Sequence, residues 1–155
     1  MGPMQAAIES LKHATSFYTK DLDALSEEQV LNSAGGVARR PVDFTYEVAL
    51  INRRVTARVK NVEPPAWPET EGFVSAPEEL LSKQAISDYL AEANRGLLEA
   101  AEAVDEEGAT KLVGPEGRQE PIFAMVSFAA MHTMYHDAQL NFIQSLNGDG
   151  EMHWF

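Results

Sequence analysis

Cysteine is absent from the 155 residues of the chain. This absence excludes a disulfide scaffold, a thiol nucleophile, a cysteine-type zinc site and an iron–sulfur cluster. Any catalysis would therefore depend on histidines, carboxylates, hydroxyl groups or a bound ion.

Basic residues and long apolar runs are also scarce. The chain has 12 Lys and Arg against 24 Asp and Glu, a formal net charge of −12. A nucleic-acid surface needs clustered Lys and Arg, so we expect no nucleic-acid partner. No apolar run approaches the roughly 18 residues that span a bilayer, and no basic segment with an apolar core opens the chain. We expect a cytoplasmic protein with no membrane partner.

The composition that remains is that of a soluble globular protein. Hydrophobic residues make up 45% of the chain and charged residues 23%, which is typical of a packed domain. The length suits one domain, and we expect residues 1–155 to form it.

Apolar residues spaced by three and four predict helices over about 4–25 and 41–61. Between them, residues 26–29 read SEEQ, a capping box that predicts a short extra turn before the Gly35-Gly36 pair. Pro41 suits the first turn of the second helix. The apolar stripe of that helix is Phe44, Val48, Ile51, Val55 and Val59.

Two further helices follow long links rich in proline or glycine, residues 62–74 and 105–120. A second capping box, residues 75–78, predicts that the third helix begins there and runs to about Val104. Pro121 opens a fourth helix that runs to about Leu146. This helix is apolar on nearly every side, so we expect it in the middle of the protein. The tail, residues 147–155, is expected to fold back. These patterns predict an all-α fold, a four-helix bundle with long links after the second and third helices.

Two histidines of the fourth helix carry the clearest chemical signal. His132 and His136 are four residues apart, so they share a helix face and can reach one divalent cation. Such a pair on an apolar helix is more often a structural feature than a metal site. The metal hypothesis therefore needs a third ligand.

Glu47 is the best candidate for that ligand. It lies beside the apolar stripe of the second helix, where a carboxylate is costly to bury unless it is paired or bound to metal. An equally good alternative is an edge glutamate that faces water or pairs with an arginine such as Arg54. Tyr135 and Gln139 flank the histidine pair and could orient an imidazole or contact a substrate, although each is also an ordinary residue between helices.

The other two histidines are weaker candidates. His13 falls opposite the apolar stripe of its helix, which indicates the solvent face or a subunit contact. His153, in the tail, is expected to be a surface or packing residue instead of a fourth ligand.

Sharper catalytic motifs are absent. Thr133 stands where a zincin would have its glutamate, and no E-x-x-H pair of the di-iron bundles occurs. The sequence also lacks G-x-S-x-G, a P-loop and G-x-G-x-x-G.

The sequence resembles the DinB/YfiT-like superfamily of helical bundles over nearly the whole chain. Two segments carry the resemblance: residues 40–54, RPVDFTYEVALINRR, and residues 132–140, HTMYHDAQL. In that family a histidine of the second helix and an H-x-x-x-H pair of the last long helix bind one divalent ion, commonly nickel or zinc. The resemblance implies the same site here, with Glu47 at the position of the family's first histidine. Two histidines and one carboxylate suit zinc, iron, manganese or nickel.

The resemblance implies a metal-dependent enzyme that acts on a small molecule, either a hydrolase or a thiol-dependent transferase. It also favours a homodimer. The departure at Glu47 leaves an alternative, in which the metal site is degenerate and the protein is a metal-free small-molecule-binding or dimeric interaction module. The Met-rich fourth helix suits such an adaptable apolar surface.

Overall fold

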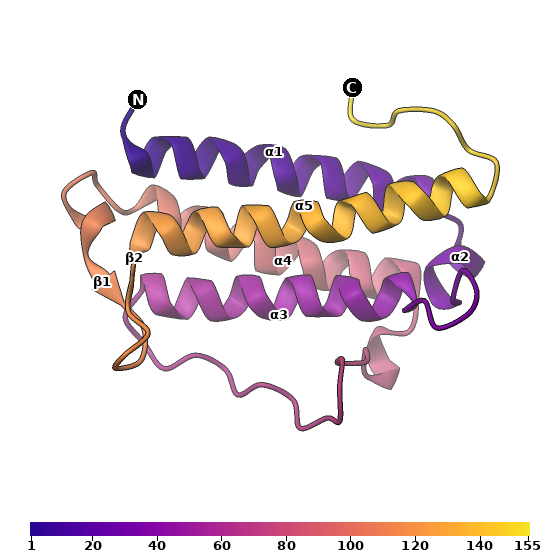
Figure 1. Cartoon of the computed structure of the whole chain (residues 1–155), viewed down its shortest axis with the longest axis horizontal. Helices are drawn as coiled ribbons and strands as arrows, with labels where there is room; N and C mark the ends of the chain where they lie inside the picture. Colours follow the sequence, from indigo (N-terminus) through magenta and orange to yellow (C-terminus); the bar gives the residue numbers. More distant parts are fainter.

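A computed structural model describes residues 1–155 as a bundle of four long helices (Figure 1). They are α1 (Pro3–Ala24), α3 (Pro41–Val59), α4 (Lys83–Glu102) and α5 (Ile122–Leu146). Helices α1 and α3 each contact both α4 and α5, so the four helices form a closed ring around the core. The predicted all-α four-helix bundle is confirmed. None of its helices combines the length and the apolar character that a membrane span needs.

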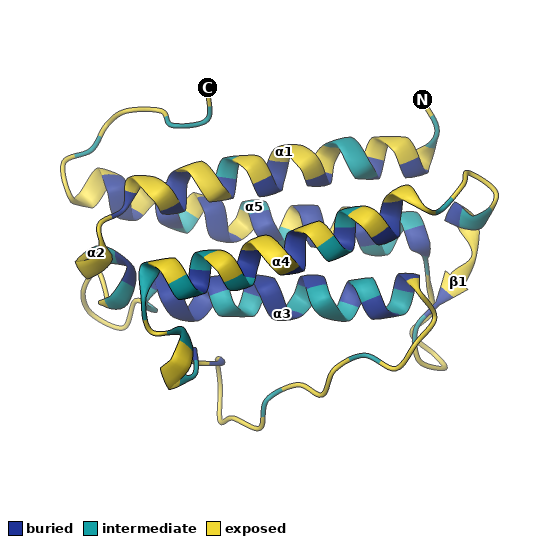
Figure 2. Ribbon diagram, turned by 180° about the vertical axis from the view of Figure 1, so that it is seen from behind, coloured by how far each residue is buried: buried dark blue, intermediate teal, exposed yellow.

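The core follows from the predicted apolar stripes. Figure 2 shows that each long helix turns its buried residues inward and its exposed residues outward. The buried side chains form two clusters along the bundle. One includes Leu11, Val55, Leu97 and Val126, and the other includes Leu22, Phe44, Leu90 and Leu140.

The short turn after α1 is the predicted capping box. It forms α2 (Glu27–Leu31). The Ser26 hydroxyl accepts a hydrogen bond from the Gln29 backbone N–H at 3.2 Å, and the Gln29 side chain accepts one from the Ser26 N–H at 2.8 Å. Gly35 and Gly36 follow with positive φ angles of 132° and 56°, a conformation that favours glycine. This turn directs the chain into α3.

The predicted start of the third helix is wrong. Residues 78–80 form only a 3₁₀ turn, and α4 begins at Lys83 with Ser82 as its cap. The backbone N–H of Ala76 donates to Asp43 Oδ1 at 2.9 Å, which ties the proposed capping box to the start of α3. Lys83 contacts the end of α1 through the carbonyl groups of Asp23 and Leu25. Tertiary contacts therefore select Ser82 instead of Ser75 as the cap of this helix.

The predicted central place of the last helix is also wrong. Helix α5 packs between α1 and α3 but leaves one face open to solvent. Large side chains exposed on that face are Phe128, Met131, Tyr135, Phe142 and Leu146. In a four-helix ring every helix has an outer face, so no position is enclosed on all sides. The apolar outer face of α5 therefore needs a separate explanation.

Two smaller features complete the fold. The link after α4 contains a two-residue antiparallel ladder, in which β1 (Leu112–Val113) pairs with β2 (Glu120–Pro121). The tail folds back as predicted, because Trp154 stacks on Phe17 of α1 with ring centroids 4.4 Å apart. The Trp154 indole N–H also donates to Asp21 Oδ2 at 2.8 Å.

Candidate metal centre

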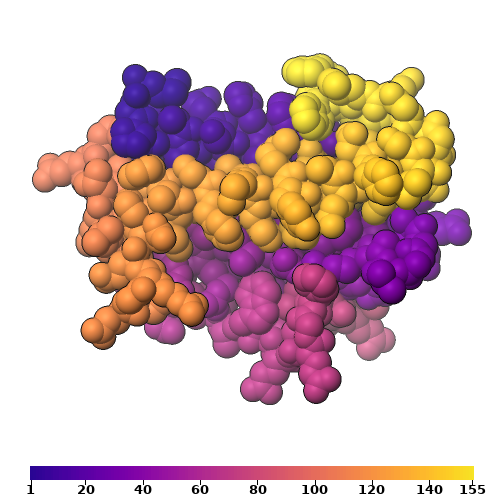
Figure 3. Space-filling model, viewed as in Figure 1, coloured from indigo at the N-terminus to yellow at the C-terminus, as the bar shows by residue number.

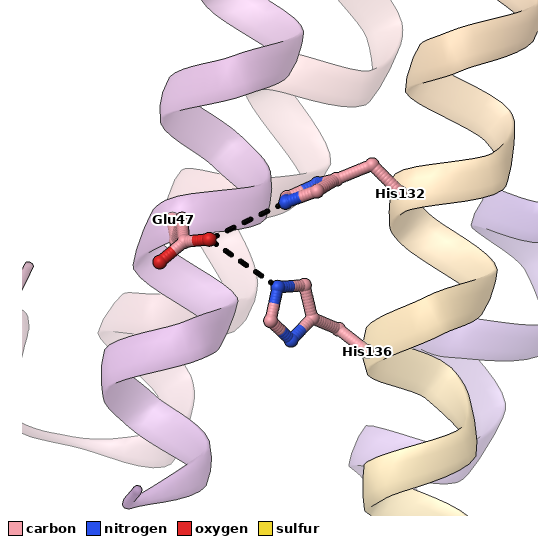
Figure 4. A group of neighbouring side chains, drawn as sticks. All are labelled: Glu47, His132 and His136. Atoms are coloured by element: carbon pink, nitrogen blue, oxygen red, sulfur yellow. Dashed lines mark hydrogen bonds and ion pairs between the residues drawn. The ribbon is translucent and has the colours of Figure 1, made fainter. Parts of the chain in front are cut away.

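Helices α3 and α5 bring Glu47, His132 and His136 together (Figure 4). Glu47 lies in the middle of α3, one turn after Phe44, and faces the two histidines of α5. One donor atom from each residue falls within 4.8 Å of the others. The three candidate ligands predicted from the sequence are thus neighbours, partly or fully shielded from solvent.

Two of the three donor–donor distances fit a small divalent ion. Glu47 Oε1 lies 3.4 Å from His132 Nε2 and 3.4 Å from His136 Nε2. Bonds to zinc are about 2.0–2.1 Å, so two ligands at the tetrahedral angle lie about 3.3–3.4 Å apart. A charge-assisted hydrogen bond would be shorter, about 2.7–2.9 Å. These two distances match the edges of a zinc coordination sphere better than direct hydrogen bonds.

Gln139 orients one of the imidazoles. Its side-chain oxygen lies 2.5 Å from His136 Nδ1, so Nδ1–H donates to this oxygen. In a neutral imidazole this leaves the lone pair of Nε2 facing the carboxylate of Glu47. Two electron-pair donors facing one another need a proton or a cation between them. The Gln139 contact therefore places His136 in the tautomer that binds metal.

Arg39 holds the other oxygen of the carboxylate. Its Nη2 lies 2.7 Å from Glu47 Oε2 and also donates to the Val74 carbonyl group at 3.3 Å. The neighbouring imidazoles of His132 and His136, together with the positive charge of Arg39, hold the pKa of Glu47 far below its usual value. Glu47 is therefore an anion at neutral pH, with Oε1 directed to the histidines.

The arginine partner of Glu47 differs from the one considered in the sequence. Arg54 instead donates to the carbonyl oxygen of Pro65. Arg39 lies in the segment before α3, where helical periodicity gives no signal, so sequence reasoning missed it. Phe44 was counted only as a core residue, yet its ring stacks on His136 with centroids 5.3 Å apart.

The remaining candidates fall into two groups. Tyr135 touches His136 edge-on, with ring centroids 5.0 Å apart, although most of its side chain is exposed. His13 and His153 lie outside the cluster. His13 is exposed and stacks on Phe17, and His153 pairs with Asp149 at 2.8 Å.

One feature is incomplete for a metal site. Metal-ligating histidines usually donate their second ring N–H to a partner. His132 Nδ1 is buried and has no hydrogen-bond partner. His136 is therefore the better oriented of the two histidines.

Comparison with known proteins yields similarity of structure only. No family model and no curated protein matches the chain. A conserved protein from Enterococcus faecalis shares 16% identity and a TM-score of 0.72, covering 94% of this chain and 97% of that one. A DinB-like protein from Bacillus cereus shares 16% identity and a TM-score of 0.71, covering 93% of this chain and 92% of that one. The chain therefore has the fold of DinB-like proteins, which the resemblance of its α3 and α5 segments implied.

Proposed function

We propose that Glu47, His132 and His136 bind one divalent ion, zinc or nickel, and that the protein is a metal-dependent enzyme acting on a small molecule. The observation that carries this proposal is the placement of Glu47 Oε1 at 3.4 Å from both imidazole nitrogens. The reaction class is that of a hydrolase or a thiol-dependent transferase. Both classes suit an open-sided site with three protein ligands.

The chemistry that such an ion supplies is a coordinated water or thiol with a lowered pKa, and hence a nucleophile near neutral pH. The chain's own residues have supporting roles. Gln139 fixes the tautomer of His136, and Arg39 pairs with Oε2 of Glu47. Phe44 covers one face of the His136 ring and shields it from water. Tyr135 stands at the exposed side of the site, where it could contact a substrate.

The metal content of the purified protein tests this proposal. After zinc or nickel is added and excess removed, the parent should retain close to one ion per chain. Glu47→Ala, His132→Ala and His136→Ala should each retain much less. His153→Ala is the matched control, because His153 also contacts a carboxylate but lies outside the cluster. A parent without metal, or equal loss in the control, would contradict the proposal.

A metal-free binding module is the second candidate function. It is favoured by the ion pair of Arg39 with Glu47 at 2.7 Å, which already gives the carboxylate a cationic partner. In that case a proton on each Nε2 takes the place of the ion between the imidazoles and Glu47, and the site is degenerate. Binding of a small molecule to protein that retains no zinc or nickel would support this function over the first.

We further propose that the chain forms a homodimer. Phe128 and Met131 support this, because both are exposed on the outer face of α5. Helix α5 has no Lys or Arg and a single acidic residue, the buried Asp137. Two chains of charge −12 repel least where such an uncharged face is the contact.

A further inference from the structure

A cavity of about 500 Å³ adjoins the candidate metal centre. It lies between the loop after α2, the start of α3 and the C-terminal half of α5. Figure 3 shows this face, where α5 (orange) lies against the purple segment that contains α2 and the following loop. The lining residues that matter here are Arg39, Phe44, Tyr135, Gln139, Phe142 and Leu146.

The inner end of the cavity is formed by residues that contact the histidines. Phe44 stacks on the ring of His136, and Tyr135 meets the same ring edge-on. Gln139 accepts from His136 Nδ1. Arg39 holds Glu47. A molecule in the cavity would therefore reach the surroundings of the metal centre without displacing a ligand side chain.

The outer wall is the apolar face of α5 that the bundle leaves uncovered. Tyr135, Phe142 and Leu146 are each more than half exposed, and all three line the cavity. An exposed apolar patch beside polar groups is typical of a binding site. A ligand with an apolar body would bury these side chains, which explains why α5 keeps them.

Two side chains of the cavity offer free hydrogen-bond donors. Arg39 Nη1 makes no hydrogen bond within the chain and is not buried, and the amide nitrogen of Gln139 is likewise free. No Asp or Glu lines the cavity, although the chain carries 24 acidic residues. An anionic or carbonyl oxygen fits these donors, whereas an ammonium group would find no acceptor carboxylate.

We propose that this cavity binds a carboxylic acid with a medium-length apolar body, or the corresponding acyl group. The apolar body lies against Phe142 and Leu146, and the carboxylate lies against Arg39 and Gln139. The inference rests on the proposed function for its chemistry, but binding requires only the cavity. If the protein is a hydrolase, water cleaves an ester of this acid to the acid and an alcohol, so the acid is the product.

Isothermal titration calorimetry with sodium octanoate tests the inference, on protein with and without added zinc. Burial of one CH₂ group contributes about 0.8 kcal/mol to binding, so each added methylene should tighten binding roughly fourfold. Hexanoate, octanoate and decanoate form the test series. Octanol should bind more weakly than octanoate, and octylamine should not bind. Affinity that is independent of chain length, or equal for octylamine, would overturn the inference.

Matched variants locate the site. Phe142→Ser should weaken octanoate binding at least tenfold, whereas Leu112→Ser should not change it. These two side chains are 65% and 55% exposed, but only Phe142 lines the cavity. Ala138→Phe should also abolish binding, because it fills the cavity from the exposed surface of α5. Equal effects of Phe142→Ser and Leu112→Ser would contradict the proposed location.

The two proposals fail separately. Octanoate binding by protein that retains no metal would support the cavity assignment and contradict the metal centre. Stoichiometric metal without binding of any acid in the series would support the metal centre and contradict the cavity assignment.

Discussion

At the scale of single residues, Gln139 orients one ligand of the candidate centre, the imidazole of His136. Its oxygen lies 2.5 Å from His136 Nδ1, and His132 has no equivalent partner. Loss of this contact frees the imidazole to rotate and to change tautomer. We therefore expect a substitution of Gln139 to weaken metal binding even though Gln139 is not itself a ligand.

We predict that Gln139→Ala weakens zinc binding about 10- to 100-fold while the protein stays folded, the usual effect of losing a group that orients a ligand histidine. Competition with a chromophoric chelator would measure the affinity. Gln84→Ala is the control, because Gln84 makes one exposed side-chain hydrogen bond, to Asp88, away from the site. Equal affinities for the parent and Gln139→Ala would show that this contact does not orient the ligand.

The residues of the site were only partly predictable from the sequence. The i, i+4 spacing of His132 and His136 fixes their shared face once a helix is assumed, and the position of Glu47 beside an apolar stripe indicates a costly burial. Arg39 could not be predicted, because it precedes α3 and reaches Glu47 only through the path of the loop. Side-chain contacts of loops depend on tertiary structure, which helical periodicity does not encode.

At the scale of elements, the same distinction explains the boundaries of the helices. Helices α1 and α3 begin and end close to their predicted limits, since proline, glycine and apolar spacing are local signals. The start of α4 was predicted at the wrong serine because Asp43 and Lys83 decide between two caps. The outer face of α5 was misjudged because composition alone does not distinguish a core residue from the wall of a cavity.

The tail is the element whose anchoring can be tested most simply. Trp154 stacks on Phe17 and donates to Asp21 Oδ2, and Asp21 Oδ1 accepts from the side-chain amide of Gln144. We predict that Trp154→Phe lowers the free energy of unfolding by about 1–2 kcal/mol, because the stack remains but the partly buried hydrogen bond is lost. Urea unfolding would measure the change.

Met152→Ala is the control for the tail. Met152 is largely exposed, and substitutions at such positions usually change stability by less than about 0.5 kcal/mol. A tail that does not contribute to stability would give the same unfolding midpoint for Trp154→Phe, Met152→Ala and the parent.

At the scale of the whole molecule, the proposed dimer depends on Phe128 and Met131, in the part of the uncharged outer face of α5 that does not line the cavity. Sedimentation velocity at about 0.15 M salt should show a dimer, and Met131→Asp should shift it toward monomer by placing a charge in the contact. Val37→Asp is the control, since Val37 is fully exposed in the loop before α3. A parent that sediments as a monomer at every concentration would exclude the dimer.

The central claim is that one ion lies between α3 and α5. Crystals of the protein soaked in zinc, measured above and below the zinc absorption edge, test it most directly. We predict one strong anomalous peak about 2.0–2.1 Å from Glu47 Oε1 and from Nε2 of both histidines. Anomalous density only elsewhere, with Glu47 still paired to Arg39 and hydrogen-bonded to His132 and His136, would contradict the account.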